Sequence, residues 1–250
     1  MKRTSFSLLA FFLLALVVFS ACKKEEAAAP NKTDDVLELA IRKVKVGQES
    51  NFLTARANFI NLLTAQNGTS NDREYAMFFP YDANIDLNEN QVFVGMTQYE
   101  DLNTYNAIGN AIGNSPEAAA FFSTFDPLVF TVLKPLEAGT EVDASKLASS
   151  GQILEIAVRD LSIYSNFNKS DYETKRDAFL AALAQRPERV AEYQWVSATN
   201  SNIVVGMTVY KSQADYLNLI SDTGFVTSQV VLDFAGNYPA HSGGIHTVVK

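Results

Sequence analysis

Two pairs of charged residues, each a glutamate and an arginine four positions apart, are the residues of this sequence best placed to do chemistry. Glu38 and Arg42 lie in Leu-Glu-Leu-Ala-Ile-Arg, and Glu155 and Arg159 lie in Leu-Glu-Ile-Ala-Val-Arg. A glutamate in a cleft can act as a general base, and an arginine can anchor a substrate. Within one extended strand the two charged groups of a pair are about 13 Å apart, so they do not pair directly.

These charges have two interpretations. The structural one is that Glu38 pairs with Arg159, and Glu155 with Arg42, so that interlocking ion pairs set the register of two halves of the molecule. The functional one is that one of these charges faces a ligand. The structural interpretation is favoured, because buried charges need partners whether or not anything binds.

Aromatic residues near the second strand of each half could line the same cleft. Tyr193 and Trp195 are the main candidates, and Trp195 is the only tryptophan. Aromatic stripes in strands more often belong to the core. The predicted cleft therefore consists of Glu38, Arg42, Glu155, Arg159, Tyr193 and Trp195.

The sequence offers little for a cofactor or a metal. It has two histidines, His241 and His246, and one cysteine, Cys22. It has no glycine-rich phosphate loop and no nucleophile elbow. We therefore predict no cofactor and no metal, and we expect His246 to be a surface residue rather than a haem ligand.

Hydrophobic periodicity predicts the elements that position these residues. Period-two alternation, as at Leu37, Leu39 and Ile41, indicates strands, and apolar residues three and four positions apart indicate helices. The predicted strands are 36–46, 74–79, 91–97, 128–133, 152–162, 191–197, 201–210 and 245–249. The predicted helices are 51–66, 99–112, 115–122, 170–185 and 212–221.

The order of these elements occurs twice. Val92–Thr97 (Val-Phe-Val-Gly-Met-Thr) is echoed by Ile203–Thr208 (Ile-Val-Val-Gly-Met-Thr), and both are followed by a tyrosine two residues later. The pattern indicates a tandem duplication, with a first unit at 36–138, a linker at 139–151 and a second unit at 152–250. Each unit reads β-α-β-β-α-β, the ferredoxin-like order.

Two such units in one chain resemble the dimeric α+β barrel superfamily, and in particular its antibiotic-biosynthesis-monooxygenase-like members. The resemblance rests on the apolar strand followed by a tyrosine-bearing helix, at Gly95–Tyr105 and Gly206–Tyr216. It implies an α+β fold in which the two units pack sheet to sheet. We expect helices to cover the Leu37 face of each sheet, so that Glu38 and Arg42 point into the barrel interior.

The N-terminus resembles that of a bacterial lipoprotein. Lys2 and Arg3 precede an apolar run at 8–19, and Ser-Ala-Cys ends it at Cys22. We predict a signal peptide at 1–21, a lipid on Cys22 and a flexible tether at 22–35, which place the protein on an outer membrane, facing the periplasm or the cell exterior. The net charge of −8 excludes a nucleic-acid partner.

Two functions fit these features. The first is a membrane-anchored module that binds a small apolar or aromatic ligand or serves as an interaction scaffold. The alternative is a cofactor-independent monooxygenase, which needs little beyond a dry pocket, a base and groups that hold an anion. Neither the ligand, nor whether the protein is an enzyme, nor its oligomeric state follows from the sequence.

Overall fold

The structure is a computed structural model that describes residues 32–250. The predicted signal peptide, Cys22 and most of the predicted tether lie outside the described residues, so these remain predictions. Within residues 32–250, no helix has both the length and the apolar character needed to cross a bilayer.

In the first half of the chain, residues 36–138, two of the three α-helices begin at a polar side chain that caps them. The Asp101 side chain accepts a hydrogen bond from Thr104 N, and Ser115 caps a helix that has a proline in its first turn. The elements of this half are β1 (Val36–Val44), α1 (Glu49–Thr64), β2 (Thr69–Pro80), β3 (Val92–Tyr99), α2 (Leu102–Ile112), α3 (Pro116–Phe122) and β4 (Phe125–Pro135).

The second half, residues 152–250, repeats this order with the same kind of caps at Asn168 and Ser212. Two short helices before the last strand, α6 and α7, were not predicted. The elements are β5 (Ile153–Asp160), α4 (Lys169–Ala184), β6 (Arg189–Ser197), β7 (Ile203–Tyr210), α5 (Gln213–Ser221), α6 (Thr223–Val226), α7 (Gln229–Asn237) and β8 (Ser242–Val248).

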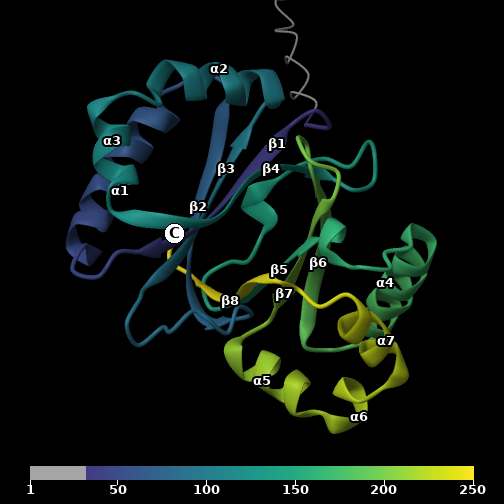
Figure 1. The fold of residues 1–250 in the computed structure, drawn as a ribbon. Coiled ribbons are helices and arrows are strands. Elements are labelled where there is room, and N and C mark those ends of the chain that lie inside the picture. The colour runs from purple at the N-terminus through teal and green to yellow at the C-terminus, as the bar shows by residue number, and fades with distance from the viewer. Residues whose placement is uncertain (1–31) are drawn as a thin grey trace, which may run out of the picture. The chain divides into compact units, whose positions relative to one another are not determined.

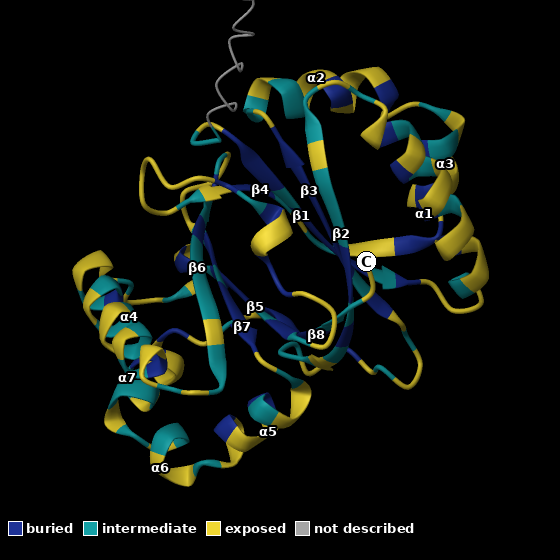
Figure 2. Cartoon of the chain, turned by 180° about the vertical axis from the view of Figure 1, so that it is seen from behind, coloured by how far each residue is buried: buried dark blue, intermediate teal, exposed yellow. Residues whose placement is uncertain are grey.

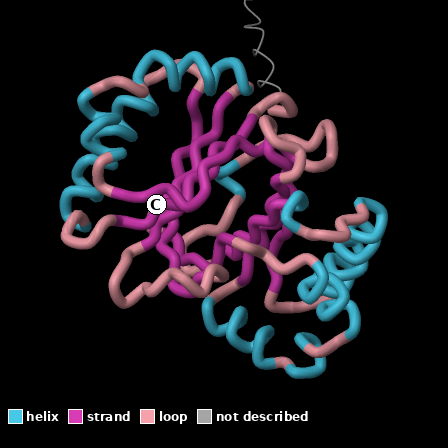
Figure 3. The backbone as a smooth tube through the Cα atoms, viewed as in Figure 1, coloured by secondary structure: helices cyan, strands magenta, loops and turns pink. Residues whose placement is uncertain are grey.

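The eight strands form one closed antiparallel barrel in the order β1-β3-β2-β8-β5-β7-β6-β4. Each half contributes four neighbouring strands in the ferredoxin-like arrangement. The halves join along two seams, β2 with β8 and β4 with β6. The helices lie outside the barrel in two groups, one for each half (Figures 1 and 3).

The barrel interior is the main hydrophobic core. Leu37, Leu39 and Ile41 of β1 and the matching Leu154, Ile156 and Val158 of β5 pack together there, and nearly all are inaccessible to solvent. Accordingly β1, β3, β5 and β7 are buried along most of their length, whereas β2, β4 and β6 carry many half-buried and exposed residues (Figure 2). The prediction for these faces was wrong: the aliphatic rows point into the barrel, and the Glu-Ala-Arg rows point outward beneath the helices. Alternation separates two faces but does not identify the inner one when both are covered.

The segment predicted as a linker, 139–151, is also part of this core. It contains a short 3₁₀ helix, Ala144–Lys146, and its apolar side chains at Val142 and Leu147 are buried against the barrel. The Gln98 amide fixes the segment in place, because it donates to Val142 O and accepts from Ala144 N. The linker therefore packs against the barrel core instead of crossing open solvent.

Two consecutive glycines let β8 fit between β5 and β2. Gly243 and Gly244 have φ values of 100° and 155°. A Cβ atom on Gly243 would lie 2.0 Å from Ile156 O, and one on Gly244 would lie 2.2 Å from Phe79 O. Residues with side chains would therefore push this strand away from its neighbours.

Candidate ligand-binding sites

Two cavities lie on the outer face of the barrel, one in each half, between the sheet and the helices. The first pocket has a volume of about 330 Å³ and is bounded by β1, β3 and helices α1 to α3. The second pocket has a volume of about 410 Å³ and is bounded by β5, β6, β7 and helices α4 to α7. Both are within the size range of small-molecule sites.

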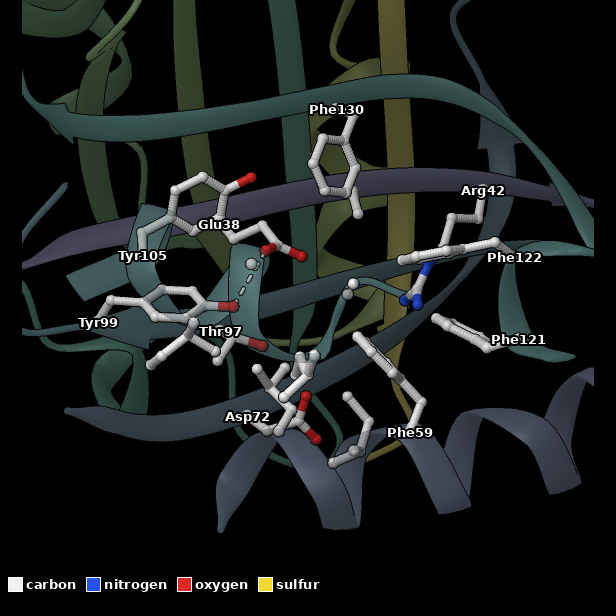
Figure 4. Close-up of a pocket in the computed structure, with 18 of the residues that line it drawn as sticks. Glu38, Arg42, Phe59, Asp72, Thr97, Tyr99, Tyr105, Phe121, Phe122 and Phe130 are labelled. Carbon is white, nitrogen blue, oxygen red and sulfur yellow. Dashed lines mark hydrogen bonds between the residues drawn. The ribbon is translucent and has the colours of Figure 1, made fainter. Parts of the chain in front are cut away.

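The first pocket has an apolar wall, with Glu38 and Tyr99 at one end and the charged groups of Arg42 and Asp72 elsewhere along its lining (Figure 4). Most of the wall comes from the helices and from β4, and it includes Phe59, Ile108, Phe121, Phe122 and Phe130. Phe122 and Phe130 are 43% and 53% exposed, so these two rings stand where the pocket meets solvent. An aromatic or aliphatic ligand would exchange water for these side chains.

Glu38 forms the polar end of the first pocket. The Tyr99 hydroxyl donates to Glu38 Oε2 at 3.1 Å, and the carboxyl group projects into the cavity (Figure 4). Burial raises the pKa of Glu38, while the Tyr99 hydrogen bond and the Arg42 charge partly offset that rise. Tyr105 packs edge-on against Tyr99, and burial together with the Glu38 charge raises the pKa of Tyr105 to about 12.

Arg42 is held beside this pocket by a buried ion-pair network. Its Nη2 atom is 2.7 Å from Glu74 Oε2. Arg56 of α1 lies 2.8 Å from Glu74 and 3.1 Å from Asp72. Gly95 makes this possible, because a Cβ atom at Gly95 would lie 2.2 Å from Arg42 Nη2.

The second pocket has the same glutamate and tyrosine on its floor. Glu155 accepts hydrogen bonds from the hydroxyls of Tyr210, at 2.5 Å, and Tyr81. Beside it, Glu192 accepts from Thr208 Oγ1 at 2.5 Å and from Gln194 Nε2 at 2.6 Å. Burial, with a further contribution from the Glu155 charge, raises the pKa of Glu192 to about 8.

The four charged residues singled out from the sequence all line these pockets, but they do not pair across the halves. Within residues 32–250, Glu38 makes no ion pair with Arg159, and Glu155 makes none with Arg42. Arg159 donates instead to Tyr238 O at 2.7 Å. The interlocking ion pairs were therefore predicted wrongly, because these side chains lie on the outside of opposite parts of the barrel.

Tyr193 and Trp195 line neither pocket. Trp195 is 5% exposed and packs in the barrel core, and the Tyr193 hydroxyl donates to Lys146 O. Both line a third cavity, of about 680 Å³, between the linker, α4 and β6. Alternation places Glu192 and Gln194, not these aromatic residues, on the pocket side of β6.

Other residues of the pockets were missed, although the repeat contained their signal. Each Gly-Met-Thr strand continues with a tyrosine, so the residues two and four positions after the glycine share its outward face. These are Thr97 and Tyr99 in the first half and Thr208 and Tyr210 in the second. Their recurrence therefore indicates the pockets as well as the repeat.

The histidines do not form a site in the described structure. His246 is fully buried, contrary to the surface position expected, and its strand partners Met77 and Leu154 belong to the barrel core. Burial lowers the pKa of His246 to about 4. Among residues 32–250, no three His, Cys, Asp or Glu residues are grouped to hold a metal ion.

No protein-family model matches the chain. No curated protein matches it either. Several solved structures, by contrast, are similar to it. One is a candidate chlorite dismutase, with a TM-score of 0.57 and 6% identity over 86% of this chain and 95% of that one. Another is an anthrone oxidase-like protein, with a TM-score of 0.55 and 9% identity over 89% and 94%.

A third is a variant of the chlorite dismutase from Candidatus Nitrospira defluvii in which one arginine is replaced by lysine. It has a TM-score of 0.52 and 10% identity over 87% of this chain and 92% of that one. At such low identities the likeness concerns the fold alone. Together with the closed eight-stranded barrel, it shows that this chain has the dimeric α+β barrel fold, with both ferredoxin-like units in one polypeptide.

Proposed function

We propose that this protein binds a small hydroxyaromatic compound in the first pocket. The observation that carries the proposal is the carboxyl group of Glu38 at the end of an aromatic cavity. Among residues 32–250, Tyr99 is its one hydrogen-bond donor, and it donates to Oε2. Oε1 is therefore left to accept a hydrogen bond from a ligand hydroxyl.

The charges around Glu38 favour a neutral ligand. Arg42 already offsets part of the Glu38 charge, and Arg42 is itself paired with Glu74. An anionic ligand would meet the Glu38 carboxyl in a site of low polarity, where repulsion is strong. A volume of about 330 Å³ is at the lower end of the range for ligand pockets, which suits a compound of two or three fused rings.

The test is the binding of 2-naphthol to the full-length protein, followed by ligand fluorescence. We expect a Kd of roughly 10–100 µM. The matched ligand 2-naphthoate, which has the same rings and a negative charge, should not bind. Equal binding of the two compounds would contradict the role given to Glu38.

Two variants locate this binding. Gly109 lies on α2 at the first pocket, and a Cβ atom added there meets no atom within 4 Å. Gly109→Phe adds a ring to the lining of the cavity and should abolish 2-naphthol binding. Glu155→Gln, a change at the residue of the second pocket that matches Glu38, should leave 2-naphthol binding unchanged.

A second candidate function is oxidation of such a ligand by dioxygen at the same site. The favouring observation is that burial raises the pKa of Glu38 in an apolar cavity, as a general base requires. Glu38 would take a proton from an acidic CH₂ group, and the carbanion would reduce O₂. The CH₂ group would become a carbonyl, and one molecule of water would be released for each O₂ consumed.

Oxygen-electrode measurements with anthrone test this second candidate, because one structure of the same fold is described as anthrone oxidase-like. We expect one O₂ to be consumed for each anthrone lost, faster than without protein, and Glu38→Gln to remove the excess rate. If the rate with wild-type protein equals the rate without it, the pocket only binds.

We also propose that a lipid on Cys22 anchors the protein to a bacterial outer membrane, facing the periplasm or the cell exterior. The support is the sequence: a basic start, an apolar run and one cysteine at its end. Metabolic labelling with an alkyne fatty acid should mark the wild-type protein and not Cys22→Ser. Protease treatment of intact cells then distinguishes the two faces of the membrane.

A further inference from the structure

We propose that the second pocket binds a small organic cation, an ammonium group carried on an apolar body. The proposal rests on two carboxyl groups that share the floor of one cavity, Glu155 and Glu192, and on the aromatic rings around them. It is independent of the ligand proposed for the first pocket.

The hydrogen-bond partners of both carboxyl groups are neutral. Glu155 is held by two tyrosine hydroxyls, and Glu192 by a threonine hydroxyl and a glutamine amide. Within the part of the chain that the structure describes, neither forms an ion pair. Two partly buried carboxyl groups share this cavity with no cation between them, so a positive ligand placed there would be stabilised by both.

The arginines that border the second pocket have other partners. Arg159 donates to Tyr238 O at 2.7 Å, and its guanidinium lies 4.6 Å from the centre of the Phe234 ring. Arg176 pairs with Asp177 at 2.7 Å. Arg189 on β6 lowers the pKa of Glu192 slightly but is not within ion-pair distance of it. Residues 32–250 therefore provide no cation at the two carboxyl groups.

The first pocket shows what is missing from the second. On β2, Glu74 is paired in register with Gly95, and on β6 the residue in register with Gly206 is Gln194. In the first pocket, arginines from the strand and the helix neutralise Glu74 and its neighbour Asp72. In the second pocket a glutamine occupies that position, and the adjacent Glu192 has no arginine partner.

Aromatic rings complete a site of this kind. Tyr81, Tyr210 and Tyr216 stand beside Glu155, and Phe179 and Phe225 belong to the same cavity wall. The faces of such rings attract an ammonium ion, and their edges pack against its apolar body. A ligand with one positive group and one ring matches both parts of the cavity.

The experiment is isothermal titration of the full-length protein with three compounds that differ in charge: 2-phenylethylamine, 2-phenylethanol and 3-phenylpropanoate. We expect the amine to bind at least tenfold more tightly than the alcohol, and the carboxylate not to bind. Because Glu192 is largely protonated at pH 7, amine binding should release a proton, seen as a binding enthalpy that depends on the buffer. Equal affinity for amine and alcohol, without proton release, would overturn the proposal.

Variants then assign the binding to this pocket. Glu192→Gln should weaken amine binding at least tenfold and abolish proton release, whereas Gly109→Phe in the first pocket should change neither. Loss of amine binding in Gly109→Phe would mean that the amine binds in the first pocket, and it would refute the assignment to the second. If Glu192→Gln does not fold, the three-compound comparison on wild-type protein still decides the charge preference.

Discussion

The two pockets are built from the same positions of the same fold, yet their acidic side chains have different kinds of partners. Glu38 and Glu155 occupy matching places on the first strand of each half, and each accepts a hydrogen bond from the tyrosine that follows Gly-Met-Thr. In the first pocket the remaining acidic groups are paired with arginines. In the second they are held by neutral groups.

The difference begins with one residue on the strand next to the glycine. Glu74 draws Arg42 across Gly95, and the helix contributes Arg56 to the same carboxyl group. Gln194 carries no charge to attract Arg159, which turns to a backbone carbonyl instead. One backbone can therefore hold either a self-neutralised site or an acidic one.

The test of this comparison with the largest expected effect on stability at neutral pH is to remove the strand arginine from each half. Arg42→Met leaves Glu74 buried without its nearest partner and should lower the free energy of unfolding by about 3–5 kcal/mol. Arg159→Met loses a hydrogen bond to a carbonyl group and a ring contact and should cost about 1–2 kcal/mol. Urea denaturation of both variants measures this, and equal losses would mean that the two arginines serve the same purpose.

The second test concerns pH. The pKa of Glu192 rises on folding from an ordinary value of 4.5 to about 8, so the folded state holds its proton more firmly than the unfolded state does. This contribution to stability is complete below pH 4.5 and is lost as the pH rises through 8.

Glu192→Gln should therefore be close to wild type in stability at pH 5 and exceed it at pH 9, by about 4–5 kcal/mol. Urea denaturation across this pH range would show the two curves separating above pH 5. Parallel curves would mean that Glu192 is ionised in the folded protein at neutral pH.

The test with the smallest expected effect on stability compares the glycines Gly95 and Gly206. Gly95→Ala would bring a methyl group against the Arg42 guanidinium, which must then leave Glu74, and should cost about 1–2 kcal/mol. At Gly206 the nearest atom, Gln194 Nε2, is 3.2 Å away and belongs to a side chain that can move. Gly206→Ala should therefore change the melting temperature little, and a reversed order would refute the explanation given for Gly95.

The sequence predicted the order of strands and helices well, because period-two and helical patterns are strong in both halves. Its main error concerned which face of β1 is inside. Leu37 and Glu38 both lie against other parts of the protein, Leu37 in the barrel and Glu38 beneath helices. Polarity alone therefore did not show which face of β1 points into the barrel. The α6–α7 segment was missed: α6 has only four residues, but α7 is as long as α5, whose helix was predicted.

The site could be predicted only in part for a related reason. The charged residues were identified by type and spacing, but their partners come from strands far apart in the sequence. Nothing near Arg42 in the sequence indicates Glu74, 32 residues away, and the Tyr81–Glu155 contact joins the two halves. Such pairings depend on the strand order of the closed barrel.

Closure of the barrel also has a consequence for how the chain folds. The last strand, β8, lies between β2 and β5, and Thr247 of β8 is paired with Ala76 of β2, 171 residues earlier in the chain. Contacts between such distant segments slow folding. While the chain is made from its N-terminus, β2 and β5 each keep an unpaired edge until β8 has emerged. A nascent chain that stalls before β8 is made is thus exposed to aggregation through these edges.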